Sequence, residues 1–206
     1  MGTDQFAAGA AEIARRDPDM AAVIEAVGPP AFRPPHEDGF AALVRAITFQ
    51  QLAGRAASAI HGRFLAAMPD GLTPEAVLAL PEPAFRAAGL SGAKTASIRD
   101  LAAKVVDGSV PLGDLDPLGD DEIVERLSRV RGIGRWTAEM FLMFQLRRPD
   151  VWPVEDLGVR KGYAFIHRLG DTPKPKELQL LGDAYRPYRT VAAWYCWRAA
   201  ETVVPD

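Results

Sequence analysis

The chain has 206 residues, of which 48% are hydrophobic and 25% are charged, a composition typical of a globular protein that buries a core. Its 24 Lys and Arg against 27 Asp and Glu give a net charge of −3, which excludes a histone-like polycation. Its single cysteine, Cys196, excludes an internal disulfide, a cysteine zinc site and a four-cysteine iron–sulfur cluster.

We expect a cytoplasmic protein, because a single cysteine forms no internal disulfide that an oxidising compartment would support. No apolar run approaches the ~18 residues of a membrane span. The N-terminus also lacks the basic-then-apolar order of a signal peptide. We therefore expect neither membrane insertion nor secretion.

Nearly the whole chain is predicted to be helical, because no stretch alternates apolar and polar residues for long enough to indicate a strand. Asp17-Pro18 and Thr73-Pro74 each offer an N-cap followed by a proline at the first helical position. The fold class is therefore all-α. The predicted helices lie near 4–15, 19–27, 38–50, 54–68, 74–80, 84–88, 94–107, 120–128, 135–147, 157–168, 176–185 and 188–202.

Charge is distributed unevenly along the second half of the chain. Residues 110–125 carry six acids and no base, whereas residues 126–168 carry nine bases and four acids. A local basic region in an acidic protein indicates an anionic partner bound on one face. The alternative is a solvated helix surface with no partner.

The segment 120–161 carries the most specific pattern. A predicted helix ends near Val130, Arg131-Gly132-Ile133-Gly134 follows, and a second helix begins at Arg135. Glycines permit a tight turn between two helices, and backbone N–H groups at the start of the second helix favour an anion such as a phosphate. The alternative is that these glycines serve only the steric needs of a helix hairpin.

Two motifs together identify a family. Residues 132–138 (GIGRWTA) are followed about twenty residues later by 152–156 (WPVED). This pair resembles the helix-hairpin-helix (HhH-GPD) DNA glycosylase superfamily, and most of all its 3-methyladenine DNA glycosylase II branch. Residues 46–52 and 185–197 agree with that branch as well, so the resemblance runs from about 36 to 200.

The resemblance implies a fold of two helical subdomains with the active site in the cleft between them. Residues 36–148 would form a helical barrel containing the hairpin at about 120–147. Residues 1–35 and 149–206 would form the second subdomain, with the catalytic aspartate loop and the C-terminal aromatic helix. The chain resembles the compact members that lack an N-terminal β domain.

The resemblance also implies a monofunctional enzyme that flips alkylated bases out of duplex DNA and initiates base excision repair. The expected substrate is 3-methyladenine, and 7-methylguanine is a second candidate. Asp156 matches the family's catalytic aspartate, and a carboxylate suits this reaction because the sugar becomes cation-like as the bond breaks. Glu155 is its local competitor, and the alternative role of Asp156 is a helix N-cap.

The base pocket implied by the resemblance contains Trp136, Met140, Trp197 and Gln50. A cationic base gains attraction over an aromatic face, which helps to offset the cost of flipping. Met140 stands where a member of the branch has a tyrosine, which leaves the substrate range open. The alternative for each tryptophan is a place in the core.

The expected DNA contacts come from three places. Gln51 is the candidate wedge that fills the gap left by the flipped base, unless it and Gln50 are only a surface pair. Lys94 is a candidate phosphate contact. The remaining contacts are expected from the hairpin, at Arg131, Gly132, Ile133, Gly134, Arg135 and Thr137. The resemblance further implies a Na⁺ or K⁺ ion held by the backbone carbonyls of Ser128, Val130 and Ile133.

Two departures from related branches limit the chemistry. Bifunctional members carry a lysine nucleophile where this chain has Trp136, so we expect base release without strand cleavage. The endonuclease III-like branch binds an iron–sulfur cluster through four cysteines, so we expect no such cluster and no required cofactor. We expect a monomer acting on damaged duplex DNA. The alternatives are a glycosylase for deaminated or etheno bases and a non-catalytic damage-binding protein.

Overall fold

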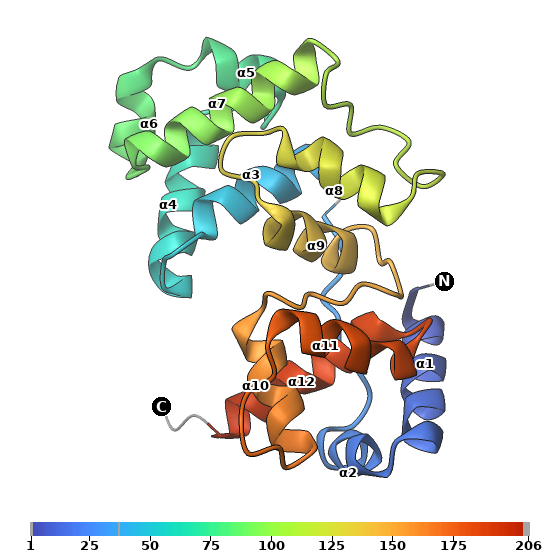
Figure 1. The fold of residues 1–206 in the computed structure, drawn as a ribbon. Coiled ribbons are helices and arrows are strands. Elements are labelled where there is room, and N and C mark those ends of the chain that lie inside the picture. The colour runs from blue at the N-terminus through green and yellow to red at the C-terminus, as the bar shows by residue number, and fades with distance from the viewer. Residues whose placement is uncertain (1, 37, 204–206) are drawn as a thin grey trace. The chain divides into compact units, whose positions relative to one another are not determined.

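The structure is a computed structural model that describes residues 2–36 and 38–203. Every regular element in those ranges is a helix, which confirms the predicted all-α fold (Figure 1). None of these helices combines the length and the apolar character that a membrane span requires. The contacts divide the chain into two compact units, which we call the split unit (1–34 with 142–206) and the continuous unit (35–141).

The continuous unit is built around a buried aromatic and aliphatic core. The Phe64 and Phe85 rings lie 5.3 Å apart, and Ile98, Leu101 and Leu127 are fully buried. Its helices are α3 (Gly39–Phe49), α4 (Gly54–Ala66), α5 (Pro74–Ala79), α6 (Glu82–Ala88), α7 (Gly92–Val106), α8 (Asp120–Ser128) and most of α9 (Arg135–Phe144).

The split unit is held by the close packing of α10 against α12. A Cβ on Gly162 would overlap the backbone carbonyl of Cys196, so only glycine allows this approach. The fully buried Tyr195 donates its hydroxyl to Gly28 O at 2.8 Å. The elements are α1 (Gly2–Arg16), α2 (Pro18–Val27), α10 (Leu157–Ile166), α11 (Pro175–Leu181), the 3-10 helix η1 (Gly182–Tyr185) and α12 (Arg189–Val203).

Local capping explains where several helices begin. Asp17 accepts hydrogen bonds from Asp19 N and Met20 N at the start of α2, and Thr73 accepts one from Ala76 N at the start of α5. Both predicted N-caps are thereby confirmed. Helix α9 ends at Phe144, three residues before the predicted end at 147, and Arg147 adopts a left-handed φ of 58°.

The structure groups residues 142–148 with the split unit, whereas the sequence analysis placed them with the hairpin subdomain. Aromatic packing explains the grouping. The Phe144 ring stacks on Trp197 with centroids 5.8 Å apart, and it lies 5.9 Å from the Phe32 ring. A sequence pattern does not reveal such contacts, because these partners are distant along the chain.

Candidate active site and hairpin

The hairpin between α8 and α9 has the geometry that its glycines predict. Gly132 has a left-handed φ of 76°, and a Cβ there would lie 2.5 Å from Ser97 Oγ. Gly132 therefore serves a steric need. Gly134 differs, because among the described residues beyond its own neighbours in the chain no heavy atom lies within 4 Å of its Cβ position. Packing within the described chain gives no reason for glycine at 134, whereas an approaching phosphate would supply one.

A side chain of helix α7 holds the backbone of the hairpin turn. Asp100 Oδ2 accepts the Arg131 backbone N–H at 2.7 Å and the Lys104 ammonium at 2.6 Å. Burial alone would raise the pKa of Asp100, but these two donors together lower it. Sequence reasoning missed this residue, because Asp100 and Lys104 look like an ordinary helical i, i+4 pair.

The basic side chains of the hairpin point outward. Arg131 is exposed, and the Arg135 guanidinium lies 3.8 Å from the exposed Asp121 carboxylate and 3.6 Å from Glu139. Ile133 and Thr137 are buried, so the DNA contacts predicted at those two positions depend on backbone groups.

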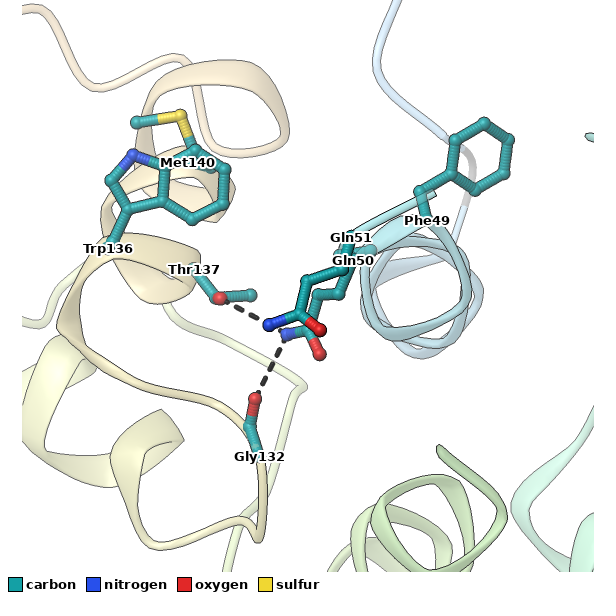
Figure 2. A pocket seen from close by; sticks show the side chains of 8 residues that line it. Phe49, Gln50, Gln51, Gly132, Trp136, Thr137 and Met140 are labelled. Carbon is teal, nitrogen blue, oxygen red and sulfur yellow. Dashed lines mark hydrogen bonds between the residues drawn. The ribbon is translucent and has the colours of Figure 1, made fainter. Parts of the chain in front are cut away.

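A pocket of about 530 Å³ lies beside the hairpin, within the continuous unit. This volume is in the range of small-molecule sites. Figure 2 shows Trp136 and Met140 on the α9 side and the two glutamines at the end of α3. Trp136 is 45% exposed, so it is not a core residue. The lining consists of Ala46, Phe49, Gln50, Gln51, Gly132, Trp136, Thr137 and Met140.

The two adjacent glutamines have different roles in this pocket. Gln50, the C-cap of α3, donates its Nε2 to Gly132 O at 3.0 Å and to Thr137 Oγ1 at 3.4 Å (Figure 2). It therefore ties the α3–α4 turn to the hairpin. Gln51 is exposed and has a left-handed φ of 57°. The two residues are thus not an equivalent surface pair.

Lys94 lies in the first turn of α7, is partly exposed and reaches the C-terminal end of α3. Its Nζ donates to the backbone carbonyl of Thr48 at 2.7 Å, and burial lowers the pKa of the ammonium. In this position the Lys94 ammonium binds the C-terminal end of α3, whereas the predicted partner of Lys94 is a DNA phosphate.

Asp156 lies in the split unit, where it caps α10. Its Oδ1 accepts Val159 N at 2.8 Å and Trp197 Nε1 at 2.9 Å. The predicted N-cap alternative is therefore correct as a description of its local role, and it is compatible with chemistry at the same carboxylate. Trp197, which was predicted to line the base pocket, is thus a hydrogen-bond donor to the Asp156 carboxylate. The competing Glu155 is exposed.

Gly158 makes the contact between Trp197 and Asp156 possible. A Cβ at this position would lie 2.9 Å from Trp197 Cδ1 and 3.0 Å from Asp156 Oδ1. Sequence reasoning did not single out Gly158. Its only signal was a glycine in the first turn of a helix, where glycine costs stability and so needs a reason.

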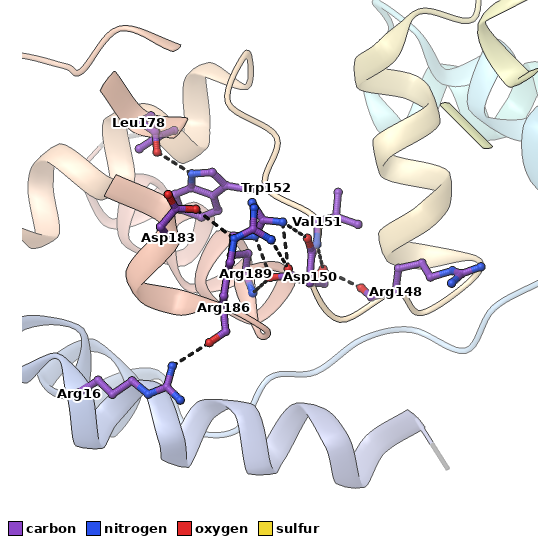
Figure 3. A network of polar contacts seen from close by, with 10 residues as sticks. Arg16, Arg148, Asp150, Val151, Trp152, Leu178, Asp183, Arg186 and Arg189 are labelled. Atoms are coloured by element: carbon purple, nitrogen blue, oxygen red, sulfur yellow. Dashed lines mark hydrogen bonds and ion pairs between the residues drawn. The ribbon is translucent and has the colours of Figure 1, made fainter. Parts of the chain in front are cut away.

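The loop before Asp156 is anchored by a polar network (Figure 3). Asp150 binds the Arg189 guanidinium at 2.7 and 2.9 Å and the Arg186 guanidinium at 2.7 Å. Arg189 also donates to the Asp150 carbonyl, and Trp152 donates its indole N–H to Leu178 O at 2.8 Å. Because Arg189 is only 9% exposed, this pairing fixes the loop from inside the unit.

Comparisons with known proteins show the family of the chain. Residues 44–186 match the HhH-GPD superfamily of base excision DNA repair proteins. The chain belongs to this superfamily. DNA-3-methyladenine glycosylase 1 of Schizosaccharomyces pombe is 38% identical over 162 residues, which are 77% of this chain and 71% of that protein.

Two solved structures of HhH-GPD relatives share the fold. The S. pombe 3-methyladenine DNA glycosylase (Mag1), solved in complex with abasic DNA, has a TM-score of 0.81 and 34% identity, covering 92% of this chain and 95% of that one. DNA-3-methyladenine glycosidase from Bacillus halodurans has a TM-score of 0.83 and 36% identity, covering 93% and 88%. The resemblance found in the sequence is thereby confirmed, whereas the predicted cleft stays a prediction.

The cation predicted for the HhH-GPD hairpin rests on backbone oxygens of Ser128, Val130 and Ile133. The carbonyl of Val130 also accepts the Ile133 N–H at 3.1 Å, which leaves one of its two lone pairs for a cation. Oxygen ligands suit Na⁺ or K⁺. These carbonyls are thus chemically suitable, and the ion stays a prediction.

One group of side chains in the described ranges could in principle hold a metal, namely Asp17, Asp19 and His167. Its acidic members already have partners. The Tyr185 hydroxyl donates to Asp17 at 2.7 Å, and Arg168 pairs with Asp19 at 2.8 Å. We interpret the group as a polar anchor between α2 and the end of α10.

Proposed function

We propose that the protein is a monofunctional DNA glycosylase that hydrolyses the N-glycosidic bond of 3-methyladenine and 7-methylguanine in duplex DNA. The observation that carries this proposal is the Asp156 carboxylate, held by two N–H donors in a chain whose relatives bear the names of alkylbase glycosylases. Such a protein would act as a monomer on DNA inside the cell.

The proposed chemistry needs little acid catalysis. An alkylated purine is already cationic and leaves readily, while the sugar develops positive charge in the transition state. Asp156 would stabilise this charge and orient the attacking water. Val159 N–H and Trp197 Nε1–H hold one carboxylate oxygen, which fixes the orientation of the group before substrate arrives.

The pocket beside the hairpin supports recognition of a flipped base. The exposed Trp136 offers an aromatic face, and a cation over such a face gains ~0.5–2 kcal/mol. Met140 adds a polarisable, adaptable wall that suits more than one methylated base. We assign to Gln51, the exposed residue of the α3–α4 turn, the role of the wedge.

Binding to undamaged DNA would depend on the hairpin. The open approach at Gly134 and the exposed Arg131 and Arg135 support phosphate contacts there. Affinity should therefore fall as salt rises. Trp136 stands where bifunctional members carry their lysine, so we propose base release without strand cleavage. The single cysteine cannot hold an iron–sulfur cluster, and we propose that no cofactor is required.

The experiment that tests this proposal uses duplex DNA methylated to contain 3-methyladenine and 7-methylguanine. Release of the free bases is followed by chromatography for the wild type, Asp156→Asn and Glu155→Gln, and strands are analysed before and after alkali. We expect release by the wild type and by Glu155→Gln only, with breaks only after alkali.

Other outcomes point to specific alternatives. Release that survives Asp156→Asn would contradict the assignment of the carboxylate. Tight binding to lesion DNA without any release would favour the non-catalytic protein. Deaminated and etheno-modified duplexes are tested in parallel. Release from these duplexes only would show that the substrates are deaminated or etheno bases.

A further inference from the structure

The α3–α4 turn carries Gln50 and Gln51 and is spanned by the backbone hydrogen bond from Leu52 N to Phe49 O, which is long at 3.3 Å. Ala53, the N-cap of α4, makes no side-chain cap hydrogen bond. At the other end, the last carbonyls of α3 have no partner within the helix, as at every helix C-terminus. The left-handed φ of 57° at Gln51 adds strain for a residue with a side chain. This turn therefore needs support from elsewhere.

Lys94 supplies that support from α7. Its Nζ lies 2.7 Å from the carbonyl of Thr48, two residues before Gln50, and so satisfies one carbonyl at the end of α3. A cation is favourable at this place because the helix C-terminus carries partial negative charge. Within the described parts of the chain no carboxylate pairs with Lys94, so its ammonium interacts with this carbonyl.

The same helix supports the hairpin through the next two turns. Ser97 lies against Gly132, and Asp100 accepts the Arg131 N–H. Lys94, Ser97 and Asp100 follow each other at three-residue spacing, which places them along one side of α7. Helix α7 thus contacts both the α3–α4 turn and the hairpin turn. Gln50 links these two turns directly to each other.

We propose that Lys94 is a positioning residue that fixes the Gln50–Gln51 turn for insertion at the lesion, and that it contacts no DNA phosphate. This inference rests on the proposed function, since insertion matters only for an enzyme that flips a base. The loss of the ammonium should release the end of α3 and let Gln51 leave its strained conformation. Specific recognition should weaken, whereas nonspecific binding should not.

The test compares Lys94→Met, which keeps the aliphatic stem, with Lys94→Arg, which keeps a charged donor. Lys176→Met is the matched control, because Lys176 is an exposed residue of α11 and its loss changes the net charge equally. Three quantities are measured: the single-turnover rate of 3-methyladenine release, the affinity for undamaged duplex across a salt series, and the affinity for a duplex with a tetrahydrofuran abasic site.

We expect Lys94→Met to lower both the release rate and the preference for abasic over undamaged duplex by roughly tenfold, the value of one charged hydrogen bond. Affinity for undamaged DNA and its salt slope should equal those of Lys176→Met. Lys94→Arg should recover most of the loss. The double variant with Gln51→Ala should be no worse than Gln51→Ala alone, because both changes remove the same insertion.

Three results would overturn the inference. A salt slope reduced by about 0.9 would identify a phosphate contact instead. Additive losses with Gln51→Ala, or a release rate and abasic preference equal to wild type, would show that Lys94 does not act through the turn. If the wild type releases no base, the glycosylase proposal fails, while the abasic preference of the same variants still tests Lys94.

Discussion

The hairpin in the continuous unit and the Asp156 loop in the split unit are held in different ways. The hairpin turn is held at its backbone, by Asp100 below Arg131 N–H and by Gln50 at Gly132 O. The Asp156 loop is held through side chains, by the buried Arg189 bound to Asp150. The proposed function gives a reason for this difference, because a surface that receives phosphates would need a fixed backbone, whereas a reacting carboxylate would need one fixed orientation.

This comparison predicts its largest effect on stability at Asp150. The change Asp150→Ala leaves the Arg189 guanidinium buried without its carboxylate, so we expect a loss of about 3–5 kcal/mol in the free energy of unfolding. Asp183→Ala is the matched control, because Asp183 also binds Arg186 but at an exposed position. Its expected loss is below about 1 kcal/mol. Urea denaturation measures both, and equal losses would contradict the role of the buried pair.

A second prediction concerns the orientation of Asp156. Trp197→Phe keeps the ring that stacks on Phe144 but removes the N–H donor to Oδ1. We expect the single-turnover release rate to fall by roughly 10- to 100-fold, the value of a hydrogen bond to a charged group, with a much smaller change in DNA affinity. A rate equal to that of the wild type would show that the indole donor does not orient the carboxylate.

A third prediction separates the two glycines of the hairpin. Gly132→Ala introduces a Cβ at a left-handed φ against Ser97, so we expect a loss of about 1–2 kcal/mol in stability. Gly134→Ala meets no described atom, so its thermal midpoint should stay near that of the wild type. The affinity of Gly134→Ala for duplex DNA should nevertheless fall several-fold. An affinity for duplex DNA equal to that of the wild type would show that Gly134 does not contact DNA.

The smallest predicted effect is a pH dependence at Asp100. Because the pKa of Asp100 is lowered in the folded protein, its carboxylate contributes stability above the ordinary aspartate pKa of about 4, and this contribution is lost as the pH falls through the folded value. The contribution should be below about 1 kcal/mol, since the side chain is partly exposed. The melting temperatures of wild type and Asp100→Asn should therefore differ at neutral pH and become equal in acid. A difference in melting temperature that is the same at every pH would contradict the role of the Asp100 carboxylate.

The sequence predicts the parts of the fold and the site that depend on neighbouring residues. The N-cap of Asp17, the glycine turn at Gly132 and the N-cap of Asp156 all follow from local rules, whereas the catalytic role of Asp156 is implied by the family resemblance. The direction of Lys94 and the donor from Trp197 do not, because each depends on a residue more than 40 positions away. The need for glycine at Gly158 is hidden for a similar reason, because it depends on Trp197, which is also distant along the chain.

The most direct measurement is the single-turnover release of 3-methyladenine by the wild type, Asp156→Asn and Glu155→Gln. Asn can still accept the hydrogen bonds of Asp156 but carries no charge, so folding and DNA affinity should be kept. The proposed mechanism predicts a loss of at least about 100-fold for Asp156→Asn and a rate near that of the wild type for Glu155→Gln. Equal rates for wild type and Asp156→Asn would contradict the assignment of Asp156 as the catalytic carboxylate.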